Sequence, residues 1–149
     1  MIITKEVEFP MGHRLQSHPG LCRHIHGHGY RVVVEVESRI LNSQGMVIDF
    51  SDLKKEMESV FEGYDHAFVI ERGDPFGDLR ALNENYPPKT TGLSRIIEIE
   101  EPPTAENLAR HWFRKLEFRI GNEDTHCRVV SVTVYESPTT SAKYERKSD

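Results

Sequence analysis

Apolar and polar residues alternate over several stretches of this chain, and the alternation predicts strands. It runs over residues 2–9, 30–37 and 128–136, and residues 137–145 are typical of a turn followed by a short last strand. A period of two returns every second side chain to the same face of a strand. We therefore expect four strands, each with one face toward a core.

Two other segments carry apolar residues at the spacing of a helix. Asp49 or Ser51 can cap the first helix, which runs through Glu62. Thr104 can cap the second, with Glu106 facing its positive end. The apolar stripes are Leu53, Met57, Val60 and Phe61 in the first helix and Leu108, Ala109, Trp112, Phe113 and Leu116 in the second. The predicted order is β-β-α-α-β-β, which is an α+β fold.

Residues 71–103 separate the two helices and are rich in proline, glycine, asparagine and charge. A structureless connection of that length is unusual inside a compact domain. We expect a helical turn over residues 78–85 and a short strand over residues 95–100. Residues 1–149 are predicted to form one domain, with an insertion at about residues 71–103.

The composition narrows the class of protein. Hydrophobic residues make up 37% of the chain and charged residues 29%, which is the balance of a globular protein. No apolar run approaches the roughly 20 residues of a spanning helix, and the N-terminus lacks the features of a signal peptide, so we expect a cytoplasmic protein without a membrane partner. A net charge of −5 leaves no broad basic surface, which argues against nucleic-acid binding. The two cysteines are expected to be thiols, since a disulfide scaffold normally has more.

The stretch CRHIHGH, residues 22–28, concentrates one thiol and three imidazoles. His26 and His28 are two residues apart, so on an extended chain both point to the face that also carries Tyr30. Antiparallel pairing of the first two strands can bring His13 beside them. Three neutral imidazoles with an open coordination position are the ligand set of a catalytic zinc. We therefore predict a zinc site.

The neighbouring residues leave alternatives open. Cys22 can be a fourth ligand, which would make the site structural, or a base or nucleophile whose pKa the metal lowers. It can also be an inert thiol, which is the better interpretation for Cys127 at the start of an apolar strand. His18 and His24 fall outside the same-face pattern and are expected in solvent.

Two carboxylates are candidates for chemistry. Asp65 directly precedes His66, and a carboxylate beside an imidazole can orient or charge it for proton transfer. Glu136 ends the alternating face that we expect to run from Val130 to Val134. A carboxylate there can accept a bidentate pair of N–H groups from a ligand. The simpler interpretation of each is a solvated surface group.

Six ordered motifs resemble those of the 6-pyruvoyltetrahydropterin synthase and 6-carboxytetrahydropterin synthase family. They are FPMGHRL, CRHIHGHGY, GMVIDFSDLKK, YDHAFV, PPTAENLARHWF and VTVYESPTTSAKY. The resemblance covers nearly the whole chain. The segment at residues 71–103 is longer than in compact members of the family, which puts the rim of the site and its substrate in question.

The resemblance implies a tunnelling fold (T-fold), in which each subunit gives a four-stranded antiparallel sheet with two helices on one face. Three subunits then close a barrel, and two trimers stack into a homohexamer. The implied roles are zinc ligands for His13, His26 and His28, general base for Cys22, assistance from a neighbouring subunit for Asp65 and His66, and pterin binding for Glu136, with Thr104 near it.

The implied activity is that of a zinc-dependent lyase. The Cys-x-x-x-His-Gly-His spacing favours a 6-carboxy-5,6,7,8-tetrahydropterin synthase, which converts 7,8-dihydroneopterin triphosphate with loss of triphosphate and acetaldehyde on the way to queuosine. A 6-pyruvoyltetrahydropterin synthase, which eliminates triphosphate without cutting the carbon chain, is the nearest alternative. A non-catalytic pterin or nucleotide binder that keeps the fold and the metal is the alternative of another class.

Overall fold

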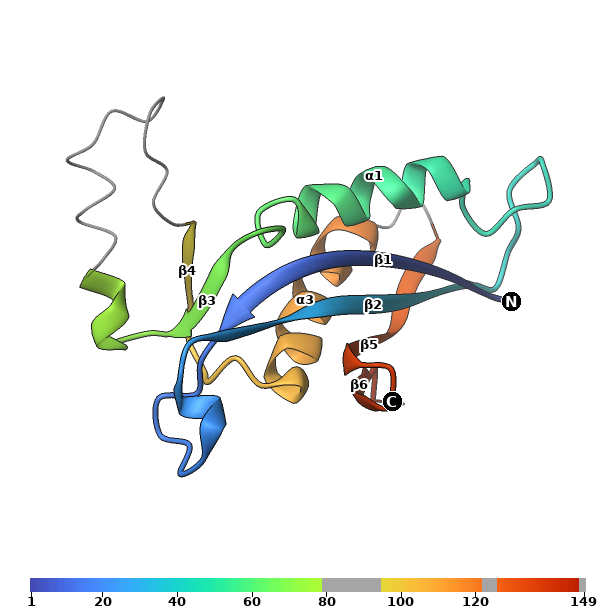
Figure 1. The fold of residues 1–149 in the computed structure, drawn as a ribbon. Helices are drawn as coiled ribbons and strands as arrows, with labels where there is room; N and C mark the ends of the chain where they lie inside the picture. The colour runs from blue at the N-terminus through green and yellow to red at the C-terminus, as the bar shows by residue number, and fades with distance from the viewer. Residues whose placement is uncertain (79–94, 122–125, 148–149) are drawn as a thin grey trace, which may run out of the picture.

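A computed structural model describes residues 1–78, 95–121 and 126–147. The strands form one curved sheet in the order β4-β3-β1-β2-β5-β6, and both helices lie on one of its faces (Figure 1). The strands are β1 (Ile2–His13), β2 (His26–Ser38), β3 (Phe68–Glu71), β4 (Ile96–Ile99), β5 (Cys127–Ser137) and β6 (Thr140–Glu145). The helices are α1 (Phe50–Phe61) and α3 (Ala105–Ile120), with short 3₁₀ helices η1 (Leu21–Arg23) and η2 (Pro75–Asp78).

The predicted α+β fold class is confirmed, and the four predicted strands pair antiparallel. Two further strands lie between the helices in the described part of the chain, so the sheet has six strands rather than the expected four. β3 adds to the end of β1 in parallel, through Gly12 and His13, and β4 pairs in parallel with β3. β3 was not expected, because its four residues are too few for alternation to reveal a strand. The strand expected over residues 95–100 is present as β4. The turn expected over residues 78–85 lies, apart from Asp78, outside the described residues, and the domain limits stay a prediction.

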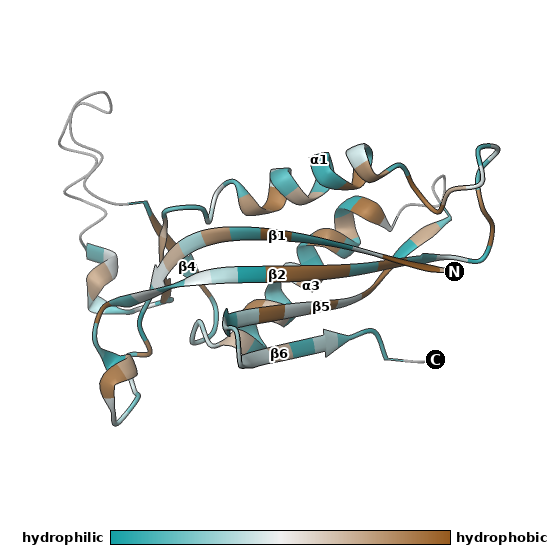
Figure 2. Cartoon of the chain, turned by 45° about the vertical axis from the view of Figure 1, so that its right-hand side comes forward, coloured by the Kyte–Doolittle hydropathy of each residue, from teal (hydrophilic) through white to brown (hydrophobic). Residues whose placement is uncertain are grey.

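The two longest strands, β1 and β2, lie side by side at the centre of the sheet. They pair antiparallel along their whole length, from Ile2 opposite Glu37 to His13 opposite His26. Alternate residues of β2 from Tyr30 to Val36 are fully buried, and Figure 2 shows hydrophobic and hydrophilic positions following one another along the strands. This alternation places one face of the sheet against the helices.

Both helices begin at the predicted side chains. Asp49 caps α1, where its carboxylate accepts a hydrogen bond from the Ser51 amide at 2.7 Å. Thr104 caps α3, where its hydroxyl accepts from the Asn107 amide at 3.3 Å. The two predicted apolar stripes are buried, and Trp112 lies fully buried at their centre. In the described ranges no helix is long and apolar enough to cross a membrane.

The alternation of β5 differs from the prediction at Val130. The pairing of β5 with β2 shifts register at this point, so Val129 is fully buried and Val130 is only half-buried. An extra residue in one strand moves every side chain before it to the other face. Val132 and Val134 keep the predicted burial. A second irregularity, between Tyr135 and Ser137 in the pairing with β6, sets the position of Glu136.

Candidate metal and substrate site

The pairing of β1 with β2 brings three histidines together at one end of the sheet. His13 lies directly opposite His26, and His28 follows on the same face of β2. Their ligand atoms all lie within 4.8 Å of one another. A Cβ at Gly27 would lie 3.0 Å from the Met11 carbonyl oxygen, so glycine at this position lets the two strands approach each other.

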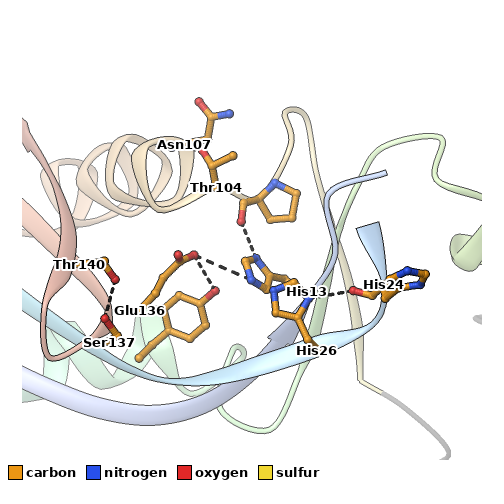
Figure 3. A network of polar contacts seen from close by, with 10 residues as sticks. His13, His24, His26, Thr104, Asn107, Glu136, Ser137 and Thr140 are labelled. Carbon is orange, nitrogen blue, oxygen red and sulfur yellow. Dashed lines mark hydrogen bonds and ion pairs between the residues drawn. The ribbon is translucent and has the colours of Figure 1, made fainter. Parts of the chain in front are cut away.

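Two backbone carbonyls orient the imidazoles. Nδ1 of His13 donates to the Pro103 carbonyl and Nδ1 of His26 donates to the His24 carbonyl, each at 2.8 Å. A carbonyl oxygen can only accept, so these bonds place the hydrogen on Nδ1 and leave Nε2 with its lone pair. This is the arrangement that fixes metal-binding histidines in proteins. Figure 3 shows His13 between Glu136 and His26, with these contacts.

The charge state of His13 suits a metal ligand. Burial lowers its pKa to about 4, against the opposing effect of its bond to Pro103 and with help from the neighbouring His26 and His28. Its imidazole is therefore neutral near pH 7. Its Nε2 is buried and has no hydrogen-bond partner within residues 1–78, 95–121 and 126–147. A buried polar atom without a partner is costly. The donor set therefore fits a metal ion.

A cavity of about 390 Å³ opens beside the three histidines. Of the predicted site residues, Cys22, Thr104 and Glu136 line it together with His13, His26 and His28. Leu15, Ala105, Glu106, Thr140, Ser141 and Ala142 complete the lining. The cavity thus joins three imidazoles from β1 and β2, a thiol from η1 and a carboxylate from β5.

Glu136 is held by a buried tyrosine. The Tyr30 hydroxyl donates to Oε1 of Glu136 at 3.2 Å, and the same oxygen lies 3.9 Å from Nε2 of His13. The His13 contact is not a charge pair, because His13 is neutral. Burial, followed by the Glu136 charge and its hydrogen bond, raises the pKa of Tyr30, so its hydroxyl stays protonated. The carboxylate is 24% exposed and can still reach a ligand in the cavity.

The two cysteines differ in their surroundings. Cys22 is half-buried in η1, and its backbone carbonyl accepts from the Leu15 amide at 2.8 Å, which ties the loop to the end of β1. Its sulfur is not part of the 4.8 Å ligand group found among the described residues. Cys127 is buried, donates from Sγ to the Val47 carbonyl at 3.0 Å, and has its pKa raised by burial.

Asp65 and His66 do not line this cavity. They form a pair of their own, in which Nδ1 of His66 donates to the Asp65 carboxylate at 2.6 Å. Both side chains are exposed, at 49% for Asp65 and 75% for His66. His66 lines a separate hollow that also contains His28. Within one subunit the structure therefore keeps this pair apart from Cys22.

Sequence reasoning missed two groups that shape the site. Tyr30 lies on the same face of β2 as His26 and His28. This shared face was the available signal that its hydroxyl would lie beside them. The Pro103 carbonyl that orients His13 had no signal in the sequence, because any residue carries a carbonyl and the contact spans 90 positions.

The fold of this chain is similar to the folds of several solved protein structures. A crystal structure of an uncharacterised protein from Wolinella succinogenes is 27% identical, covers 99% of this chain and 98% of its own, and has a TM-score of 0.82. The 6-pyruvoyl tetrahydropterin synthase of Caenorhabditis elegans, 23% identical over 99% of this chain and 96% of its own, has a TM-score of 0.68 and shows likeness of fold. Fold and cavity together define a T-fold protein whose three-histidine group can bind a metal.

The chain belongs to the 6-pyruvoyl tetrahydropterin synthase family, whose model matches residues 2–147. A relative from Haemophilus influenzae, named 6-carboxy-5,6,7,8-tetrahydropterin synthase, is 32% identical over 148 residues, which cover 96% of this chain and 97% of the relative. The resemblance described from the motifs is therefore confirmed. The chain is an enzyme of the tetrahydropterin synthase type, a lyase.

Proposed function

We propose that this protein is a zinc-dependent 6-carboxy-5,6,7,8-tetrahydropterin synthase. It converts 7,8-dihydroneopterin triphosphate and water to 6-carboxytetrahydropterin, acetaldehyde and triphosphate, a step toward queuosine. The observation that carries the proposal is the cavity in which three imidazoles meet the Cys22 thiol and the Glu136 carboxylate. The name of the Haemophilus relative supports the choice of product.

His13, His26 and His28 hold the metal in this proposal. Zinc bound there supplies a Lewis acid that acidifies the hydroxyl groups of the substrate side chain and stabilises the enolate-like charge that develops. The bonds to the Pro103 and His24 carbonyls keep Nε2 of two ligands aimed at the shared position.

Glu136 binds the pterin ring, and Thr104 lies beside it. A carboxylate matches the paired N–H donors of a pterin, because both of its oxygens accept. The Tyr30 hydroxyl occupies one lone pair of Oε1 and fixes the carboxylate, while the remaining acceptor sites face the cavity. The ring is thereby oriented so that its side chain points toward the histidines and Cys22.

Cys22 moves the protons. Its thiolate takes a proton from a side-chain carbon of the substrate, and the resulting thiol returns a proton to the neighbouring carbon. η1 presents Cys22 at the cavity wall rather than within the metal's ligand group, so the sulfur is available to the substrate. Cys127 has no part in this chemistry, since it lies in the core.

The site is shared between subunits of a homo-oligomer, which we propose is a hexamer. Asp65 and His66 do not line the cavity that contains the Cys22 of their own chain. The β3 pairing covers β1 only at Gly12 and His13, and β6 stands at the other end of the strand order. Sheet edges of this kind pair readily with another chain. Joining such edges closes a barrel and brings the pair of one subunit to the thiol of the next.

Mixing two impaired variants tests the sharing. Cys22→Ala and His66→Ala subunits, each with only residual turnover alone, are expected to recover part of the wild-type activity after exchange, because some interfaces then carry both intact groups. The measurement is turnover against mixing ratio, with mass analysis to verify that mixed oligomers form. Mixed oligomers that keep only the residual turnover would contradict the shared site.

The second candidate is a 6-pyruvoyltetrahydropterin synthase, which the name of the matching family model favours. Both reactions release triphosphate, but only the first cuts the carbon chain. Incubation with 7,8-dihydroneopterin triphosphate followed by mass analysis of the pterin separates them. A carboxylated tetrahydropterin supports the first function, and a pyruvoyl product establishes the second.

A further inference from the structure

The turn that carries Asp65 and His66 holds an unusual backbone conformation. His66 has a φ of 56°, which lies in the left-handed region that residues other than glycine rarely occupy. Its amide donates to the Pro10 carbonyl of β1 at 2.8 Å, and the Ala67 amide donates to the Tyr64 carbonyl at 3.0 Å. Such a conformation persists only where the surroundings determine it. The contacts around this turn therefore set where the His66 ring points.

Arg95 contacts this turn from the segment between the two helices. Nη1 of Arg95 donates to the Asp65 carbonyl and Nη2 donates to the Glu62 carbonyl, each at 3.0 Å. The Arg95 carbonyl itself accepts from the Phe68 amide at 2.7 Å, which fixes its backbone beside β3. The planar guanidinium can serve both carbonyls at once from one fixed geometry.

The charge of Arg95 suits this position. The last turn of α1, which is described throughout, contains no basic residue. The carbonyl end of a helix favours a cation, and Glu62 is the residue at the C-terminal end of α1. Arg95, from the segment between the two helices, supplies the cation there and bridges the helix end to the carbonyl of Asp65.

We propose that Arg95 is a positioning residue for the Asp65–His66 pair. It clamps the turn after α1 so that the pair keeps the orientation in which it acts at the thiol of a neighbouring subunit. This inference rests on the proposed function of the pair. Arg95 thereby gives the end of the long insertion a role in catalysis, although Arg95 itself touches no substrate.

The test uses Arg95→Ala alone and combined with His66→Ala. Arg72→Ala is the matched control, because Arg72 also lies in this segment and its guanidinium pairs with the exposed Glu100 at 2.6 Å. Arg95→Ala is expected to lower kcat by about tenfold, since small misplacements of reacting groups cost up to about 100-fold. KM and bound metal are expected to stay as in wild type. In the His66→Ala background, Arg95→Ala is expected to cost nothing further, because the two changes act on one unit.

Hydrogen exchange of the His66 amide gives a readout independent of activity. Loss of the clamp is expected to speed this exchange by about tenfold in Arg95→Ala and not in Arg72→Ala. Unchanged exchange in Arg95→Ala, or a kcat loss that persists in full beside His66→Ala, would overturn the proposal. If His66→Ala alone keeps full turnover, the proposed function of the pair fails, and the exchange measurement still decides whether Arg95 holds the turn.

Discussion

Replacing Cys22 by alanine is expected to lower turnover by at least about 100-fold, because a positioned acid or base contributes about 100- to 10,000-fold. Cys22 lines the cavity beside the three histidines without belonging to their ligand group. The variant should therefore keep its metal and its fold. The measurement is kcat with the natural triphosphate substrate, together with metal content for the same preparation.

The second thiol of the chain provides the control. Cys127→Ala removes a buried sulfur that donates to the Val47 carbonyl and does not line the cavity. It is expected to lower stability and leave kcat near the wild-type value. A Cys22→Ala protein that turns over at the wild-type rate would remove the thiol from the mechanism. Loss of the metal in this variant would instead make Cys22 a ligand.

Removing one of the three imidazoles is expected to have a second large effect, a loss of metal binding. Wild-type protein is expected to hold about one zinc per chain. His26→Ala or His28→Ala should weaken binding by more than about 100-fold, since loss of a mere outer partner of a ligand already costs about 10- to 100-fold. Metal analysis after dialysis against a weak chelator measures the loss, and turnover should fall with it.

His24→Ala is the matched control for these variants. Its imidazole is exposed, and the contact that matters to His26 comes from the His24 backbone carbonyl, which alanine keeps. This variant is expected to retain both metal and activity. Full metal occupancy in both His26→Ala and His28→Ala would reject the ligand assignment.

Much of this site could be predicted because side chains two residues apart on a strand point to the same face. His26 and His28 share a face whatever the details of packing, and the pairing of β1 with β2 extends without interruption to His13. The helix caps at Asp49 and Thr104 are equally local, since each side chain bonds to an amide two or three residues away. Such caps depend only on residues close together in the sequence, so the sequence can predict them.

The rest depends on contacts that sequence patterns do not carry. β3 has only four residues and was not expected, and its parallel pairing with β4 brings together segments from opposite ends of the insertion. The register shift in β5 that buries Val129 instead of Val130 leaves no trace in a run of valines. The two hydrogen bonds of Arg95 span 30 and 33 positions. The separation of His66 from Cys22 within one subunit was expected from the family resemblance alone and not from any pattern of these residues.

Zinc-dependent synthesis of 6-carboxytetrahydropterin is tested most directly by measuring the products of a single enzyme preparation. The preparation is first stripped of metal and then supplied with zinc. Incubated with 7,8-dihydroneopterin triphosphate, the stripped enzyme is expected to be inactive. After zinc is added it should release acetaldehyde and 6-carboxytetrahydropterin in equal amounts. Turnover that survives complete removal of the metal, or triphosphate release without acetaldehyde after zinc is restored, would contradict a zinc-dependent 6-carboxytetrahydropterin synthase.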